Sequence, residues 1–216
     1  MPQEEKVALS QRIANENTER IKSDLYYFLE EYVYTLDEHD VNNPVKRLPM
    51  DKQYLKDMVT LFINERLLIF EKSRQMLVTW VMVACHLWDA MFHDGRRIFF
   101  QSKKEQDANH LVDRAKFIYN HLPDWLRQLY PANTPMAYCK LEWGKHNSII
   151  QGIPQGAEQL RQYTASRIFS DEMAFQEKKE EAYIAAKPTI TGGGSYIGVS
   201  SPNFKEFFYL LKSDKI

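Results

Sequence analysis

Short apolar runs alternate with helix-like segments along most of this chain, and this alternation limits the folds that the chain can adopt. The runs that look like buried strands are LLIF at 67–70, RIFFQS at 97–102, SIIQGIP at 148–154, RIFSDE at 167–172 and SYIGVSS at 195–201. An apolar helical segment (79–92) and an amphipathic one (103–122) lie between the first three of them. Strands that alternate with helices are typical of α/β layers around a largely parallel sheet, so we predict an α/β fold.

The N-terminal part is expected to be helical. Apolar side chains recur at helical spacing in residues 4–36, and a polar, proline-containing connector follows at 37–49. Asp51 can serve as the N-cap of a second helix. We expect residues 1–44 to form an N-terminal helical extension and residues 45–216 to form the main domain.

Composition narrows the classes of partner. The formal net charge is −1, so no global basic field indicates nucleic acid, and any DNA contact must come from a local patch. Cys85 and Cys139 match no metal-site spacing and favour a reducing compartment. The polar N-terminus carries no signal peptide, and no apolar run approaches the ~20 residues needed to span a bilayer. No membrane partner is therefore expected.

Two adjacent acids end the run RIFSDE. In open α/β sheets, ligands bind beyond the carboxyl ends of the strands, where Asp171 and Glu172 are expected to lie. An aspartate there can hold Mg²⁺ against nucleotide phosphates, and a glutamate beside it can deprotonate an attacking water. The alternative is a solvated acidic turn.

The segment EKSRQMLVTW lies between a strand-like run and an apolar helix, where a phosphate-binding P-loop of the form G-x-x-x-x-G-K-[ST] would lie. Only Thr79 matches that pattern. Lys72, Leu77 and Val78 stand at the places of the first glycine, the second glycine and the lysine. Thr79 can still ligate Mg²⁺, the helix N-terminus can bind phosphate, and Lys72 or Arg74 can supply the cation. The segment indicates either an altered nucleotide site or an ordinary basic corner, and Leu77 predicts an altered loop or weaker binding.

A third polar segment, SSPN, follows the run SYIGV. Ser200 and Ser201 are expected at the same sheet edge, where their hydroxyls can sense a γ-phosphate. Asn203 can belong to this site or simply cap the helix that follows.

In their order and spacing, these segments resemble the ATPase domain of large terminase subunits, the DNA-packaging motors of tailed bacteriophages. KSRQMLVTW is similar to the terminase Walker A turn, in which the lysine can sit early in the loop, RIFSDE to the Walker B strand and VSSPN to the coupling motif. RRIFFQSKKEQDANHLVDRAKFIYNHLP resembles the segment after Walker A, and the resemblance covers roughly residues 45–212. It implies a P-loop NTPase (RecA-like) three-layer domain with a mainly parallel central sheet, without the nuclease domain that follows it in full-length terminases.

The resemblance also implies a set of site residues, with ATP and Mg²⁺ as cofactors. Glu172 would be the catalytic base, and Arg161 would be an arginine finger given to a neighbouring subunit, unless it forms a surface ion pair. Gln53 would read the adenine, unless it is an ordinary exposed glutamine. Thr79 and Asp171 would hold Mg²⁺. The other nucleotide-binding residues would be Lys72, Ser73, Arg74, Gln75, Met76, Leu77, Val78, Ser200, Ser201 and Asn203, together with Thr79.

The implied function is Mg²⁺-dependent ATP hydrolysis that drives double-stranded DNA into a procapsid. The expected partners are the DNA, further copies of the chain in a ring, the portal and the small terminase subunit, in the host cytoplasm. Two rivals stay open: a helicase-type ATPase fragment with the same sheet, and a pseudo-ATPase that serves as a DNA-binding or assembly module. Leu77 and Val78 favour the pseudo-ATPase, whereas the intact Asp171–Glu172 pair favours hydrolysis.

Overall fold

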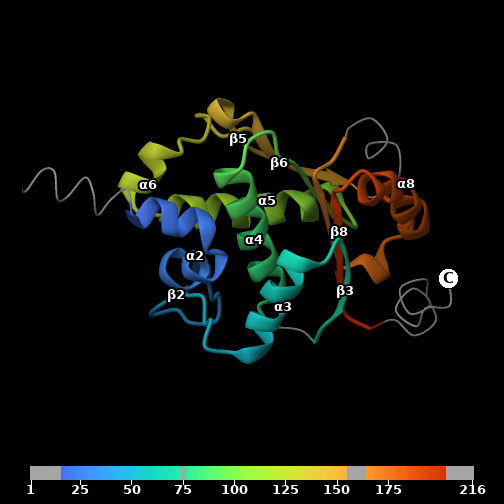
Figure 1. Ribbon diagram of the computed structural model, residues 1–216. Helices are drawn as coiled ribbons and strands as arrows, with labels where there is room; N and C mark the ends of the chain where they lie inside the picture. The colour runs from blue at the N-terminus through green and yellow to red at the C-terminus, as the bar shows by residue number, and fades with distance from the viewer. Residues whose placement is uncertain (1–15, 74–75, 155–163, 203–216) are drawn as a thin grey trace, which may run out of the picture.

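The structure, a computed structural model, describes residues 16–73, 76–154 and 164–202 of the chain. Its centre is a six-stranded sheet made of β3 (Leu67–Glu71), β4 (Arg97–Ser102), β5 (Lys140–Trp143), β6 (Ser148–Pro154), β7 (Arg167–Asp171) and β8 (Ser195–Ser200). The spatial order is β3-β8-β7-β4-β6-β5 (Figure 1). All neighbouring strands run parallel except β5, which is antiparallel to β6. This arrangement confirms the predicted α/β class.

Helices cover both faces of this sheet. The helices on one face are α3 (Gln53–Asn64), α4 (Val78–Phe92) and α5 (Glu105–His121), and the helix on the other face is α8 (Lys179–Thr191) (Figure 1). Successive strand residues therefore enter two separate apolar clusters. Phe169 of β7 packs with the α4 side, while its neighbour Ile168 packs with the α8 side. A parallel sheet with both faces covered in this way forms the middle of three layers.

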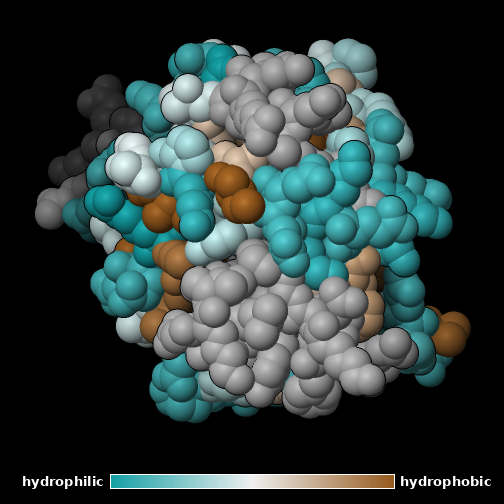
Figure 2. Space-filling view, turned by 90° about the vertical axis from the view of Figure 1, so that its right-hand side faces the viewer, coloured by the Kyte–Doolittle hydropathy of each residue, from teal (hydrophilic) through white to brown (hydrophobic). Residues whose placement is uncertain are grey.

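Shorter elements complete the described chain. Between α5 and β6 lie α6 (Asp124–Leu129), β5 and the 3₁₀ turn η1 (Gly144–His146). A second such turn, η2 (Met173–Phe175), follows β7. Among the described residues, no helix has the length and apolar character needed to cross a bilayer. On the face next to α8, the coloured surface is mostly hydrophilic and its hydrophobic spots are small and separate (Figure 2).

The N-terminal region differs from the predicted continuous helix over residues 4–36. Within its described part, residues 16–23 and α2 (Leu25–Tyr32) are helical, and Asp24 separates them by accepting a 3.0 Å hydrogen bond from the Tyr27 amide as the N-cap of α2. The chain then becomes extended at β1 (Tyr34–Leu36). The side chains of α2 join the same apolar cluster as those of α4. The proposed domain boundary at residue 44 stays a prediction.

The expected connector at 37–49 contains a strand, β2 (Val45–Arg47), which pairs antiparallel with β1. Lys46 stabilises this hairpin because its ammonium lies 2.7 Å from Asp37 and 2.9 Å from Asp40. The polar composition of residues 37–49 therefore gave no indication of the β-hairpin. The predicted cap at Asp51 is also wrong, since α3 has Lys52 at its N-cap and no side-chain cap. The last helix predicted from the sequence lies outside the described residues.

A buried carboxylate ties the C-terminal end of α4 to the sheet. Asp89 is 1% exposed, and its oxygens lie 2.7 Å from Arg167 Nε, 3.2 Å from Arg96 Nε and 3.1 Å from His93 Nδ1. Burial alone would raise the pKa of Asp89, but the contact with His93 and the two guanidinium charges outweigh it and lower the pKa to about 2. The cluster therefore holds a charged carboxylate inside the fold.

This lowered pKa predicts a specific loss of stability in acid. Because the folded-state pKa lies below the unfolded value of about 3.9, the stabilisation is complete above pH 4 and is lost as the pH falls towards 2. Its size is about 2 kcal/mol, from a shift of nearly two pKa units. Urea unfolding of wild type and Asp89→Asn at several pH values should show this loss in wild type alone. Equal pH slopes in the two proteins would contradict the prediction.

Candidate functional site

Three polar strand ends meet at one edge of the sheet. β8 lies between β3 and β7, and its register places Ser200 opposite Glu71 and Val199 opposite Asp171. The residues that follow β3 and β7 are thereby brought to either side of the end of β8. The backbone amide of Lys72 also donates a 2.9 Å hydrogen bond to the Ser200 carbonyl. Segments far apart in the sequence thus form a single site, as expected from the shared carboxyl edge of parallel strands.

Glu172 is at the centre of the contacts between these strand ends. Its Oε1 accepts a 3.0 Å bond from Lys72 Nζ, and its Oε2 lies 3.4 Å from Ser200 Oγ and 3.5 Å from the Ser201 amide nitrogen. Adjacent strand residues normally point to opposite faces. Glu172 does not follow this alternation, because it comes directly after β7 and its backbone has the left-handed conformation, with φ 48° and ψ 42°. The turn brings both acids of the pair to the same edge.

Asp171 and Thr79 form the second part of the site. The Thr79 hydroxyl lies 3.3 Å from each carboxylate oxygen of Asp171. Burial is the main cause that raises the pKa of Asp171; the neighbouring Glu172 carboxylate acts in the same direction, whereas Lys72 and Arg114 oppose it. A hydroxyl and a carboxylate are oxygen ligands of the kind that Mg²⁺ prefers, with waters and phosphates completing its shell. These two side chains therefore fit the predicted metal.

The start of α4 forms the third part. Leu77 is its N-cap and has φ 56° and ψ 6°, the left-handed conformation that glycine adopts most readily. The Leu77 carbonyl accepts a 3.0 Å bond from the Val81 amide, and the hydroxyl of Tyr54 on α3 donates to the Met76 carbonyl at 3.2 Å. The chain thus adopts, with a leucine, a turn that the P-loop pattern assigns to glycine. The left-handed region costs a non-glycine residue roughly 1–2 kcal/mol.

This strain predicts an unusual ranking of variants. Leu77→Gly should be more stable than Leu77→Ala by about 1 kcal/mol, because both lose the leucine side chain but only glycine relieves the left-handed backbone. Glycine is ordinarily the less stable choice, since it loses more conformational entropy on folding. Urea denaturation of the two variants checks the ranking. If the alanine variant is equally or more stable, the loop does not hold Leu77 in this conformation in solution.

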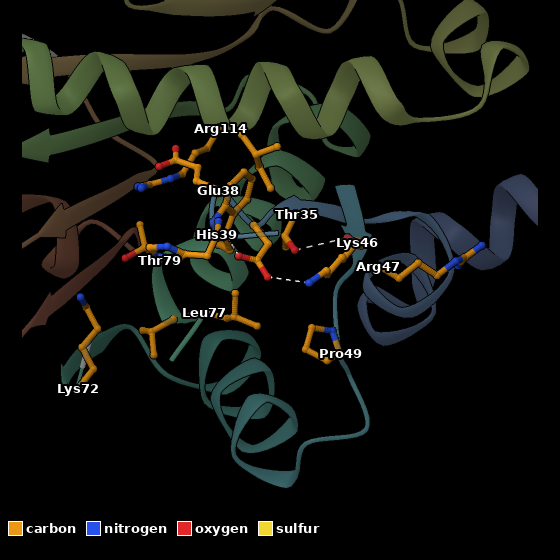
Figure 3. Close-up of a pocket in the computed structure, with 14 residues that line it drawn as sticks. Thr35, Glu38, His39, Lys46, Arg47, Pro49, Lys72, Leu77, Thr79 and Arg114 are labelled. Atoms are coloured by element: carbon orange, nitrogen blue, oxygen red, sulfur yellow. Dashed lines mark hydrogen bonds and ion pairs between the residues drawn. The ribbon is translucent and has the colours of Figure 1, made fainter. Parts of the chain in front are cut away.

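A cavity of about 900 Å³ opens beside these residues. Its wall at the predicted phosphate turn consists of Lys72, Leu77, Val78 and Thr79, and its other walls come from the β1–β2 hairpin, Trp80 and Arg114 of α5 (Figure 3). Ligand pockets in proteins usually measure about 300–1,000 Å³. The cavity is therefore large enough for a nucleotide.

Not every predicted residue lines this cavity: Asp171, Glu172, Ser200 and Ser201 lie at the sheet edge and are not among its lining residues. Gln53 is exposed at the start of α3, where its amide donates a 2.9 Å bond to Asp57, and it is not among the lining residues. Ser73 is exposed, and Met76 is half-buried. Arg74, Gln75, Arg161 and Asn203 lie outside the described residues. The roles of all these residues stay predictions.

Sequence reasoning missed several residues that line the cavity. Arg114 comes from the polar side of the amphipathic helix α5, where nothing in the local pattern separates it from other charged residues. Thr35 lies in the segment that was predicted to be helical (4–36), and His39 and Lys46 lie in the predicted polar connector (37–49). The antiparallel pairing of β1 with β2 places them at the cavity.

No protein-family model matches this chain. Among solved structures, the large terminase of bacteriophage HK97 is similar with a TM-score of 0.68 and 16% identity, over 89% of this chain and 40% of that one. A variant of the ATPase domain of the Thermus phage P74-26 large terminase has a TM-score of 0.51 and 11% identity, over 70% and 66% of the two chains. The large terminase of a thermophilic bacteriophage, in complex with ADP, has a TM-score of 0.53 and 14% identity, over 76% and 43%.

These similarities show that the chain has the fold of large terminase ATPase domains, which confirms the predicted RecA-like architecture. The chain spans 40% of the length of the HK97 terminase.

Proposed function

We propose that this chain is the ATPase domain of a phage large terminase, which hydrolyses ATP to drive double-stranded DNA into a procapsid. The observation that supports this most is the meeting of Lys72, Thr79, Asp171 and Glu172 at one edge of a sheet with this fold. The complex of one similar terminase with ADP supports a nucleotide as the ligand.

Each group has a task that follows from its position. The amides at the start of α4 and the ammonium of Lys72 bind the phosphates. Thr79 and Asp171 hold Mg²⁺, which when bound offsets the negative charge of the phosphates. Glu172 orients the attacking water and accepts its proton.

The pairing of Lys72 with Glu172 suggests how binding prepares the site. Lys72 Nζ lies 3.0 Å from Glu172 Oε1, so the lysine is ion-paired with the carboxylate that has to accept the proton of the attacking water. A bound phosphate competes for the same ammonium and releases Glu172. Ser200 and the Ser201 amide, which contact the other carboxylate oxygen, then sense the change at the end of β8. In this way the Ser200–Ser201 segment can relay the phosphate state to the DNA-gripping surface.

The wider assembly is part of the same proposal. In the host cytoplasm, copies of the chain assemble into a ring that docks transiently on the procapsid, with the portal and the small terminase subunit as further partners. Arg161 acts in a neighbouring copy, and Gln53 and Asn203 reach the nucleotide when it is bound.

A second candidate is a pseudo-ATPase, a DNA-binding or assembly module that has lost hydrolysis. The left-handed Leu77 favours it, because a leucine side chain at this turn restricts how closely the backbone can approach a phosphate.

Separate measurements of binding and turnover by the wild-type chain distinguish the two candidates. Calorimetry with ADP and with a non-hydrolysable ATP analogue, both with Mg²⁺, measures binding. Phosphate release from ATP across a range of protein concentrations measures turnover. Binding with turnover supports the ATPase, and binding without turnover at any concentration supports the pseudo-ATPase. Absence of nucleotide binding contradicts the ATPase and leaves the DNA-binding or assembly module.

A further inference from the structure

Four cationic side chains of Lys and Arg line the cavity within the part of the chain that the structure describes, and three of them are paired with carboxylates. Lys46 lies 2.7 Å from Asp37, Arg47 lies 3.6 Å from Glu31, and Lys72 lies 3.0 Å from Glu172. Arg114 differs. Among the described residues, no carboxylate oxygen comes within ion-pair distance of its guanidinium, although Glu38 also lines the cavity.

A tryptophan holds this arginine beside the start of α4. The Arg114 guanidinium carbon lies 5.5 Å from the centroid of the Trp80 ring, and that ring packs edge-on against Phe117, with 5.7 Å between the ring centroids. Trp80 follows Thr79 in the first turn of the helix. In Figure 3, the side chain of Arg114 leaves α5 in the direction of Thr79. Within the described parts of the chain, the charge is therefore positioned by packing and not by an acidic partner.

The position of Arg114 also indicates which end of a bound nucleotide this side chain would contact. Thr79, Asp171 and Glu172 mark the end where metal, water and the transferred phosphoryl meet. Arg114 lines the same cavity as Thr79. The planar guanidinium also matches phosphate oxygens better than an ammonium does. An arginine that has no ion-pair partner among the described residues is placed at this end for an anion that arrives with the ligand.

We propose that Arg114 binds the terminal phosphate of ATP from within its own subunit. This inference rests on the proposed function and adds to it a residue that needs no neighbouring copy. It predicts that the chain distinguishes a triphosphate from a diphosphate through Arg114, even as a monomer.

The test compares the affinities of two nucleotides in three proteins. The wild type, Arg114→Ala and a control, Arg127→Ala, are titrated with ADP and with a non-hydrolysable ATP analogue, both with Mg²⁺, in a calorimeter. Arg127 is a suitable control because it lies on α6, pairs with Asp124 and is not among the cavity residues. Arg114→Ala should weaken binding of the ATP analogue roughly 10- to 100-fold, the loss expected for one charge-assisted hydrogen bond. Its ADP affinity and both affinities of the control should stay at wild-type values.

An unchanged ratio of the two affinities in Arg114→Ala overturns the inference, whether both affinities fall together or neither falls. If the wild type binds neither nucleotide, the proposed function itself fails, and the inference fails with it. Arg114→Gln keeps part of the aliphatic stem and replaces the alanine variant if that protein does not fold. It should lose the same preference for the triphosphate.

Discussion

Replacing Glu172 with glutamine should remove most ATP turnover and leave ATP binding intact. The amide has nearly the shape of the carboxylate, so the contacts from Ser200 and Ser201 can persist, but it cannot accept the proton of the attacking water. The loss of a general base commonly lowers the rate by about 10²–10⁴-fold. Phosphate release measures the rate, and calorimetry with a non-hydrolysable analogue measures the affinity.

The ion pair between Lys72 and Glu172 adds an expectation about the affinity for ATP. In the wild type, a phosphate has to draw Lys72 away from Glu172, and the 3.0 Å contact opposes this. The glutamine variant has no such charge, so its affinity for the ATP analogue should equal or exceed that of the wild type. Glu180→Gln, an exposed acid in the first turn of α8, is the control and should change neither quantity. Wild-type turnover in Glu172→Gln would contradict the assignment of the base.

Local sequence patterns were sufficient for much of the fold. The strands at 97–102 and 148–154 agree with β4 and β6 because short apolar runs lie between clear turn residues. The apolar segment 79–92 agrees with α4, whose place between α3, α5 and the sheet buries nearly all its sides. In each of these cases, the apolar run and the turn residues that bound it indicate the element.

The meeting of the site residues was predictable for a different reason. Because parallel strands share one carboxyl edge, polar residues after β3, β7 and β8 had to lie near one another. The spatial order of those strands was not predictable, since no local signal says that β8 inserts between β3 and β7. That order decides which side chains touch, and it explains why the pairing of Lys72 with Glu172 appears only in the structure.

Other features depend on tertiary contacts that a single sequence does not display. The β1–β2 hairpin pairs two three-residue strands, which are too short to show a clear alternation. The position of Arg114 depends on how α5 lies beside α4. The left-handed conformations of Leu77 and Glu172 contradict their ordinary preferences, and surrounding contacts have to impose them. Such residues cluster at functional sites, and both of these border the same site.

Replacing Lys72 with alanine should weaken ATP binding and turnover far more than replacing Val78, the residue at the usual lysine position. The Lys72 side chain is 12% exposed and ends 3.0 Å from Glu172, at the edge where the phosphates are expected. Val78 is 4% exposed and belongs to the apolar core. Lys72 therefore contributes a charge to the site, whereas Val78 contributes apolar packing.

The expected sizes follow from that difference. Loss of one hydrogen bond to a charged group costs about 1.5–3 kcal/mol, so Lys72→Ala should lose roughly 10- to 100-fold in affinity for the ATP analogue, and turnover should fall as well. Val78→Ala loses two buried methyl groups and about 1.5 kcal/mol of stability at ~0.8 kcal/mol for each, with wild-type affinity. Calorimetry and urea unfolding measure the two effects. Lys72→Met keeps the aliphatic stem, so it should lose affinity to the same extent as the alanine variant if the charge is the cause. Normal binding and turnover in both Lys72 variants would mean that another cation, with Arg74 as the first candidate, holds the phosphates.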